Sequence, residues 1–236
     1  MRGLESKGES PLQFVRQMKK TIVYIDGFNL YYGLLQGNPS CKWLDLYKFA
    51  SALLRPDHEI VAIRYFTARI RPYPNDVAAV ERQKIYLQAL SATGKVQVVE
   101  GFYNKSKVWL PAADSAMRSS SFAREGMVRV VKFEEKRSDV NLAVAMMLDA
   151  FRNEADSFVV VTGDSDQVGA IESVRHDFGK SVLVFNPHVT ISNRLKQAAS
   201  YYKNIPRDLP ARCQLPDTIP CGPRGDRFIH RPPAWR

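Results

Sequence analysis

The sequence predicts a three-layer α/β protein, in which a mostly parallel central sheet of about five strands lies between two layers of helices. Two observations lead to this prediction. Short β-branched and apolar runs alternate along the chain with stretches of helical periodicity, as in βαβ units. The clearest run, 158–161, is apolar at every position, which is typical of a parallel strand covered on both faces.

The elements follow in order from these two patterns. Strands are expected at 21–25, 59–70, 95–103, 158–161 and 181–185, with a further edge strand at 201–205. Helices are expected at 30–35, 44–54, 76–93, 140–151 and 166–176, with a last one opening at Thr190 or Ser192. Asn75 and Ser138 are the expected N-caps of the third and fourth helices, and Gly94 ends the third.

One helix carries a regular apolar stripe. Its members are Val140, Ala143, Val144, Met147, Leu148 and Phe151, and this spacing predicts that they face the core. The segment 104–126 has no clear period, and we expect an excursion or hairpin at one end of the sheet.

Composition bounds the domain organisation. We expect a flexible arm over 1–19, one domain over 20–205 and a Pro-rich basic tail over 206–236. Of the net charge of +10, most lies in the ends, so charge alone does not decide between solvated tails and attraction to nucleic-acid phosphates. No apolar run is long enough for a membrane span. Three scattered cysteines without a C-x-x-C favour a reducing, cytoplasmic setting.

Carboxylates follow two of the expected strands and open the helix between them. Asp26 follows strand 21–25, Asp164 and Asp166 follow strand 158–161, and Asp139 opens the helix that precedes this strand. Each alone is more often a helix N-cap than a ligand. Together, if the two strands are neighbours, they meet at the carboxyl edge of the sheet, where Mg²⁺ or Mn²⁺ relieves their repulsion. The four histidines have no ligand spacing and are expected in loops or on the surface.

Three blocks of this sequence resemble those of the NYN domain, a branch of the PIN-like nuclease superfamily, and are most similar to its LabA/DUF88 group. They are Tyr-Ile-Asp-Gly-Phe-Asn-Leu (24–30), Glu-Lys-Arg-Ser-Asp-Val-Asn-Leu-Ala (135–143) and Val-Thr-Gly-Asp-Ser-Asp (161–166). The resemblance covers about 20–200. It implies a Rossmann-like PIN/NYN fold. Arg137 departs from the family's usual Gly, where it would aid phosphate binding or crowd the turn, and Gln167 replaces a small apolar residue, with little consequence expected.

The resemblance also implies a metal-dependent (endo)ribonuclease that hydrolyses phosphodiesters of single-stranded or structured RNA with Mg²⁺ or Mn²⁺. Asp26, Asp139, Asp164 and Asp166 match the acidic pocket as metal ligands, and Asn29 would orient a water or a phosphate oxygen. Candidates for RNA contact are Tyr31, Tyr32, Lys136, Arg137 and Ser138. For the two tyrosines, packing within a short helix is the more common role. A solvated face explains Lys136 and Arg137 equally well.

Two other functions do not fit the sequence. A haloacid-dehalogenase-type phosphatase is disfavoured, because it needs a second Asp two residues after the nucleophile, where this chain has Phe28. A dinucleotide fold needs Gly-x-Gly-x-x-Gly after the first strand, which is absent. The serious alternative is a catalytically silent NYN module that binds RNA or a protein in a regulatory role. We expect no membrane association, and a homodimer is compatible with the family pattern.

Overall fold

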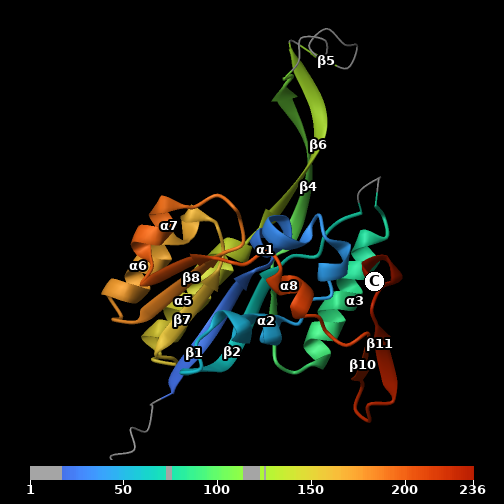
Figure 1. Ribbon diagram of the computed structural model, residues 1–236. Helices are drawn as coiled ribbons and strands as arrows, with labels where there is room; N and C mark the ends of the chain where they lie inside the picture. The colour runs from blue at the N-terminus through green and yellow to red at the C-terminus, as the bar shows by residue number, and fades with distance from the viewer. Residues whose placement is uncertain (1–17, 73–75, 114–122, 125) are drawn as a thin grey trace, which may run out of the picture.

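The central sheet has six parallel strands in the order β3-β2-β1-β7-β8-β9 (Figure 1). The computed structural model describes residues 18–72, 76–113, 123–124 and 126–236. The strands are β1 (Lys19–Asp26), β2 (His58–Thr67), β3 (Gln97–Glu100), β7 (Ser157–Val161), β8 (Ser181–Asn186) and β9 (Tyr201–Asn204). The predicted three-layer α/β fold is confirmed, with the expected edge strand as the sixth. The expected N-terminal arm lies almost wholly outside the described residues.

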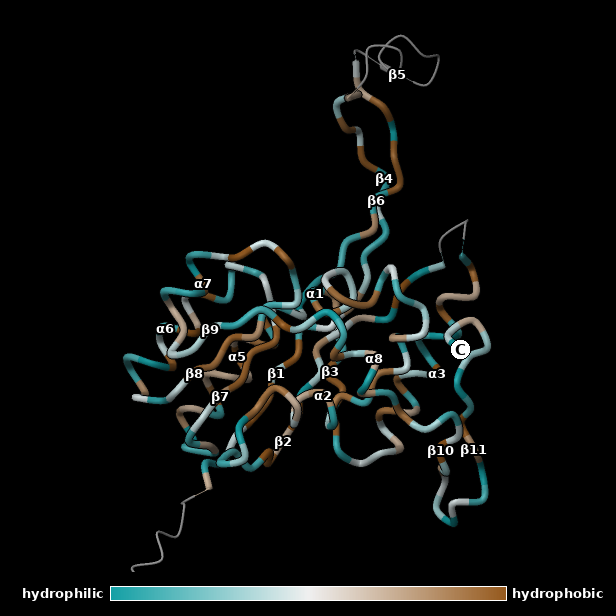
Figure 2. The backbone as a smooth tube through the Cα atoms, viewed as in Figure 1, coloured by the Kyte–Doolittle hydropathy of each residue, from teal (hydrophilic) through white to brown (hydrophobic). Residues whose placement is uncertain are grey.

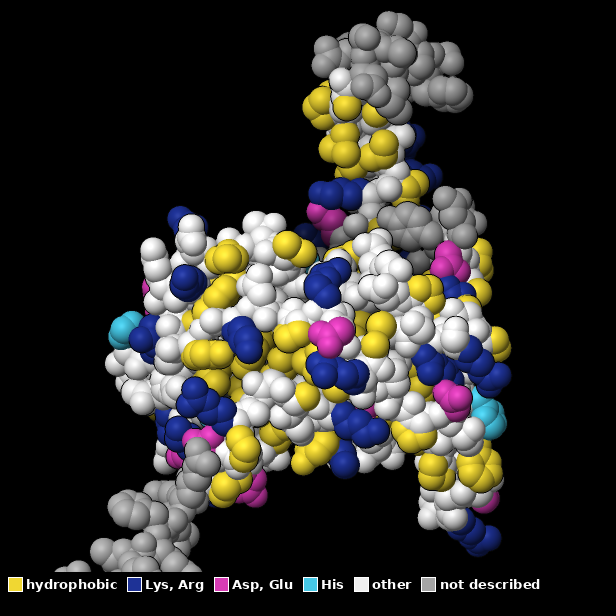
Figure 3. Space-filling model, in the orientation of Figure 1, with side chains coloured by type: hydrophobic (Ala, Val, Ile, Leu, Met, Phe, Trp, Pro, Cys, Tyr) yellow, Lys and Arg dark blue, Asp and Glu magenta, His cyan; other side chains and the backbone are white. Residues whose placement is uncertain are grey.

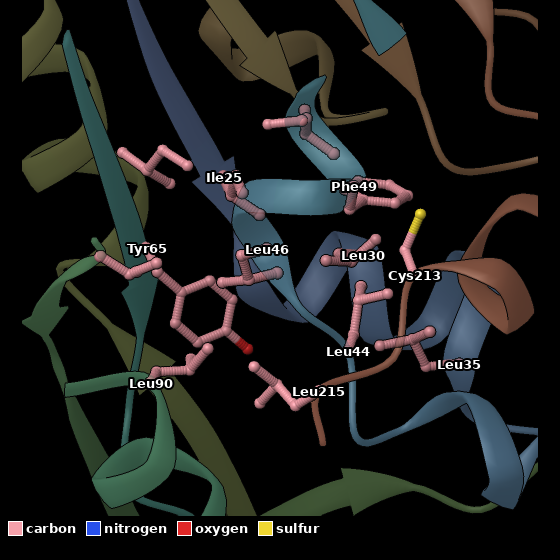
Figure 4. Close-up of a cluster of buried hydrophobic side chains, with 14 of the residues drawn as sticks. Ile25, Leu30, Leu35, Leu44, Leu46, Phe49, Tyr65, Leu90, Cys213 and Leu215 are labelled. Carbon is pink, nitrogen blue, oxygen red and sulfur yellow. The ribbon is translucent and has the colours of Figure 1, made fainter. Parts of the chain in front are cut away.

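The two faces of the sheet bury separate apolar cores, because side chains alternate along each strand. One face of β1 and β7 packs against α1 (Gly27–Leu30), the π-helical turn Tyr31–Leu35, α2 (Leu46–Leu53) and α3 (Ala79–Ala92). Figure 4 shows part of this core. The other face packs against α5 (Ser138–Phe151), α6 (Val168–His176) and α7 (Asn193–Ala198). The hydrophobic colouring of the central strands in Figure 2 follows from this double burial.

No helix in the described ranges combines the length and the apolar character that a membrane crossing requires.

The expected excursion is an antiparallel β-arm that projects from the sheet (Figure 1). It pairs β4 (Phe102–Pro111) with β6 (Met127–Lys136), and β6 also pairs with the short β5 (Ala123–Arg124). Large apolar side chains are exposed on the outer half of the arm, including Trp109 and Val131. Figure 3 shows hydrophobic side chains gathered on the outer part of the arm and Lys and Arg side chains nearer its base. The hairpin alternative of the sequence prediction is therefore correct.

The expected tail from residue 206 is wrong, because this segment packs onto the domain. It forms α8 (Leu209–Arg212), the hairpin of β10 (Thr218–Cys221) and β11 (Arg227–His230), and a last 3₁₀ turn, Pro233–Trp235. Five of its apolar residues, Leu209, Cys213, Leu215, Ile219 and Trp235, are buried in the core that includes α1, α2 and α3, whereas Phe228 is exposed. Composition indicated a tail since proline is frequent there, but five well-placed apolar side chains are enough to dock the segment.

Two expectations for α5 are also corrected. The predicted core stripe faces outward: Val140 is 64% exposed and Phe151 is 74% exposed. Leu142, Met146 and Ala150 are buried instead. Because α5 is apolar almost all round, its period allowed either face. The predicted N-cap is displaced by one residue, since Arg137 occupies that position in the left-handed region at φ 82°.

A buried polar network selects the face of α5 that packs on the sheet. Asp149 of α5 accepts a 2.6 Å hydrogen bond from the Tyr24 hydroxyl of β1. Its other carboxylate oxygen accepts a 2.7 Å bond from the Arg64 guanidinium of β2. Burial, with Asp149 beside it, raises the pKa of Tyr24 far above its ordinary value. The tyrosine therefore stays a donor, and α5 is held in one rotation about its axis.

Replacing Asp149 should destabilise the fold strongly. Asp149→Ala leaves Arg64 without its ion-pair partner and the Tyr24 hydroxyl without its acceptor in a buried setting. We expect the free energy of unfolding in urea to fall by about 3 kcal/mol. The exposed Asp177→Ala, at the end of α6, is the matched control and should change it by less than about 0.5 kcal/mol. A small loss in Asp149→Ala would mean that the network does not fix α5.

Candidate active site

Asp26 lies at the carboxyl end of β1 and is 2% exposed. As the N-cap of α1, it accepts a 3.0 Å hydrogen bond from the Asn29 backbone N–H on Oδ1. Its Oδ2 accepts from the Asn29 side-chain amide at 2.6 Å and from the Thr162 hydroxyl at 3.2 Å. The carboxylate is therefore held in one orientation by the residues that follow β1 and β7.

Asn29 joins three segments at this edge of the sheet. Because its Nδ2 donates to Asp26, its Oδ1 is an acceptor and receives the Gly163 backbone N–H at 3.2 Å. The Nε2 atom of His188, which follows β8, lies 3.0 Å from the same oxygen. This ring nitrogen must therefore carry the hydrogen. A Cβ on Gly163 would lie 2.5 Å from the His188 ring, so this close approach requires glycine.

Asp164 and Asp166 lie in the loop that leaves β7. Asp164 caps the 3₁₀ turn Ser165–Gln167 and accepts the Asp166 backbone N–H at 2.9 Å. The prediction that Asp26 and Asp164 act as helix N-caps is therefore confirmed. Capping does not exclude a second role, because each carboxylate oxygen has further lone pairs.

Asp139 lies in the first turn of α5 and is tied to the same loop. The buried Gln167 side chain donates a hydrogen bond to the Asp139 backbone carbonyl at 3.3 Å. Gln167 therefore joins α5 to the loop after β7, whereas we expected little consequence from it. Arg137, the residue before α5, stacks its guanidinium over the Phe102 ring at 4.8 Å, at the base of the arm. Its positive φ explains why glycine would suit this position.

The carboxylates at this edge repel one another. Burial, followed by the charges of Asp26, Asp164, Glu135 and Asp166, raises the pKa of Asp139 to about 6. Burial also raises the pKa of Asp26, against its hydrogen bonds from Asn29 and Thr162, and the charge of Asp164 adds to the rise. Within the described ranges, no Lys or Arg forms an ion pair with any of the four predicted acids.

The donor chemistry of this cluster fits a hard divalent cation. Carboxylate oxygens are preferred ligands of Mg²⁺ and Mn²⁺, and a cation among them would relieve the repulsion that raises the pKa of Asp139. Across the described part of the chain, however, no three Asp, Glu, His or Cys side chains are already gathered closely enough to hold a metal. The carboxylates therefore suit the ion by type, and binding would draw them together.

The proposed RNA-contacting residues fall into three places. Tyr31 and Tyr32 line a cavity of about 380 Å³, the aromatic cavity, beside Gly27 and Phe28. Lys136 and Arg137 lie at the base of the arm, where Lys136 pairs with Glu134 at 3.3 Å. Ser138 is 2% exposed and its Oγ has no hydrogen-bond partner, so this hydroxyl is turned away from solvent.

Sequence reasoning missed three residues at this edge: His188, Thr162 and Glu135. Thr162 lies in the third block but was not singled out as a site residue. His188 follows β8, and the only signal for it was its place just after a strand end, which many loop residues share. Glu135 of β6 accepts the Ser138 backbone N–H at 3.0 Å and reaches the cluster because the arm returns beside α5.

Comparisons with known proteins find a matching family and similar proteins. A family model described as the NYN domain matches residues 20–206. The chain is 32% identical to the 6-hydroxy-3-succinoylpyridine 3-monooxygenase HspA of Pseudomonas putida, over 92% of this chain and 75% of that protein. Among solved structures it is similar to VPA0982 of Vibrio parahaemolyticus, a protein of unknown function. That likeness has a TM-score of 0.47 and 18% identity, and it covers 81% of this chain and 96% of VPA0982.

The stability of the metal-free protein should depend on pH through Asp139. Its folded-state pKa of about 6 exceeds the ordinary 3.8, so its contribution to stability is full below pH 4 and is lost as pH rises through 6. Asp139→Asn removes this loss. In EDTA, the free energy of unfolding of the variant minus that of the wild type should be about 1 kcal/mol greater at pH 7 than at pH 4, after allowance for solvent screening. Urea unfolding at both pH values measures this.

The exposed Asp177→Asn is the control and should show the same difference from wild type at both pH values. An equally constant difference for Asp139→Asn would contradict the raised pKa.

Proposed function

This chain belongs to the NYN domain family, and on that premise we propose that it is a metal-dependent ribonuclease. The observation that carries the proposal is the cluster of four acids at the carboxyl edge of the sheet, where burial, followed by the charges of Asp26, Asp164, Glu135 and Asp166, raises the pKa of Asp139. A family relation to PIN-like nucleases gives this cluster a reaction, the hydrolysis of RNA phosphodiester bonds by water.

Asp26, Asp139, Asp164 and Asp166 would hold one or two Mg²⁺ or Mn²⁺ ions. Such an ion lowers the pKa of bound water and neutralises charge on the oxygens of the reacting phosphate. Asp139 must lose its proton to serve as a ligand, so its pKa of about 6 makes metal uptake favourable near neutral pH and weaker below it.

The remaining residues of the site position these carboxylates. Asn29 fixes the orientation of Asp26 through two hydrogen bonds, and His188 and Gly163 in turn fix the Asn29 amide. Because His188 donates to this oxygen, it acts as a positioning residue in this arrangement. Lys136 and Arg137 are proposed to attract RNA phosphates at the base of the arm, where the acids alone would repel them.

The alternative is that the same edge binds RNA or a protein without cutting. Two features support this alternative. Asp26 and Asp164 already cap helical turns, and no ready cluster of three metal ligands exists among the described residues. The presence of all four acids favours the nuclease, since helix capping alone does not need like charges gathered at one place.

A second candidate function comes from the named relative, a 3-monooxygenase of 6-hydroxy-3-succinoylpyridine. One observation favours an activity of that kind here: the aromatic cavity lies beside Gly27 and Phe28, directly after Asp26, and has the ring-lined character that a pyridine substrate needs. A chain with this relative is therefore proposed, as the second choice, to act on a small aromatic acid.

The nuclease is tested with labelled single-stranded and structured RNA in Mn²⁺, Mg²⁺ or EDTA. Asp164→Asn should cut at least a hundredfold more slowly than wild type, because it removes a charged ligand. Its fold should persist, since asparagine caps a helix as well as aspartate does. The matched control is Asp226→Asn, in the exposed β10–β11 turn, which should cut like wild type.

Three outcomes distinguish the nuclease from the catalytically silent module. Metal-dependent cutting that Asp164→Asn abolishes supports the nuclease. RNA binding without cutting in any metal supports the silent module. Cutting that persists in Asp164→Asn contradicts the assigned site.

The second candidate has its own assay. The protein is incubated aerobically with 6-hydroxy-3-succinoylpyridine and a reduced nicotinamide or flavin cofactor, and the products are separated by liquid chromatography. On the nuclease account the pyridine remains unchanged. Conversion that fails in Tyr32→Ala, but proceeds in the exposed Tyr201→Ala, would establish the second function instead.

A further inference from the structure

The aromatic cavity is a built feature separate from the acidic cluster. It has a volume of about 380 Å³, within the range of small-molecule sites. None of the four acids lines it. Seven aromatic side chains do so: Phe28, Tyr31, Tyr32, Tyr65, Tyr86, Tyr103 and Trp235. Such a density of rings at one opening favours a flat aromatic ligand over a flexible polar one.

Four of the lining rings contact one another beside α1. Phe28 stacks on Tyr32 with their centroids 6.4 Å apart and meets Tyr103 of the arm at 5.7 Å. Tyr31 meets Tyr32 edge to face at 5.3 Å. Tyr32 is 55% exposed, so a ligand can cover part of its side chain.

The other three lining rings, Tyr65, Tyr86 and Trp235, are buried and contact one another in series. Tyr65 meets Tyr86 edge to face at 6.4 Å, and Tyr86 meets Trp235 in the same way at 6.1 Å. Trp235 also packs against Trp43, whose indole N–H donates to the Pro216 carbonyl at 2.8 Å. The docked C-terminal segment thus supplies part of the cavity and fixes its shape, because Trp235 is held by two further rings.

The charged side chains of the cavity have a positive excess. Lys42, Arg71 and Arg82 line it together with one carboxylate, Asp76. Asp76 pairs with Arg82, and Lys42 donates to the Tyr31 hydroxyl at 3.2 Å. In the described part of the chain Arg71 forms no ion pair, and it is exposed at the cavity. A guanidinium in this position is suited to a carboxylate or phosphate.

From these observations we propose that the aromatic cavity binds a planar aromatic ring that carries an anionic group, with the ring against the aromatic lining and the anion at Arg71. Two sources offer this chemistry: a nucleotide, whose base stacks and whose phosphate is the anion, and a free aromatic acid. Binding needs neither a metal nor cleavage, so this proposal can be tested independently of the proposed nuclease.

Isothermal titration calorimetry of the full chain in EDTA tests this binding, since EDTA removes any metal-mediated contribution of the acidic cluster. The probes are AMP and UMP for the first source, and 6-hydroxynicotinate and 4-oxo-4-phenylbutanoate for the second. Adenosine and acetophenone, which have the ring without the anion, are the matched ligands. At least one anionic probe should bind saturably. AMP should bind about tenfold more tightly than adenosine, or 4-oxo-4-phenylbutanoate about tenfold more tightly than acetophenone.

Two exposed substitutions locate the site without disturbing the core. Tyr32→Ala removes stacking surface and Arg71→Gln removes the cation, and each should weaken the best probe about tenfold. Tyr201→Ala on β9 and Arg194→Gln on α7 make the same changes elsewhere and should leave the affinity unchanged. Circular dichroism confirms that each variant is folded.

The outcomes are distinct. Nucleotide binding alone makes the cavity a base-stacking subsite, whereas binding of the aromatic acids alone makes it a small-molecule site; either supports the proposal. Absence of saturable binding for all four anionic probes at millimolar concentration overturns it. Equal affinity for charged and neutral probes, or binding unaffected by both Tyr32→Ala and Arg71→Gln, overturns it as well.

Discussion

Parallel pairing of β1 with β7 is the constraint on which the rest of the structure depends. Its register sets Ile25 beside Val161, so that Asp26 and Thr162 leave the sheet side by side. Thr162 then donates to Asp26, and the next residues, Gly163 and Asp164, enter the same edge. A different strand order would leave each carboxylate as an isolated cap. With this order, the fold gathers negative charge that it must balance.

The protein balances this charge only in part. Asn29 and Thr162 donate to the oxygens of Asp26, and the Asp166 backbone N–H donates to one oxygen of Asp164. No basic side chain of the described residues pairs with these acids. The basic residues lie outside the acidic cluster instead. Lys136 is at the base of the arm, and Lys42, Arg71 and Arg82 line the aromatic cavity. This separation suits a site that takes a cation among its acids while attracting an anionic ligand beside them.

The sequence carried the order of the elements and the four acids, because strand runs and strand-end carboxylates are local signals. It did not carry what depends on distant packing. The rotation of α5 is set by Asp149 with Tyr24 and Arg64, and the only local hint was one acid between apolar Met146 and Ala150. His188 joins the site through strand order, and Trp235 reaches the cavity through a segment whose prolines indicated a tail.

The central claim is that the carboxyl-edge acids form a divalent cation site with Asp139 as a titrating member. Calorimetric titration of Mn²⁺ into the metal-free protein at several pH values between 5 and 7.5 tests it most directly. The account predicts saturable binding that tightens by up to about tenfold per pH unit below 6 and levels off above it, as Asp139 loses its proton. Absence of saturable binding, or an affinity independent of pH across this range, would contradict it.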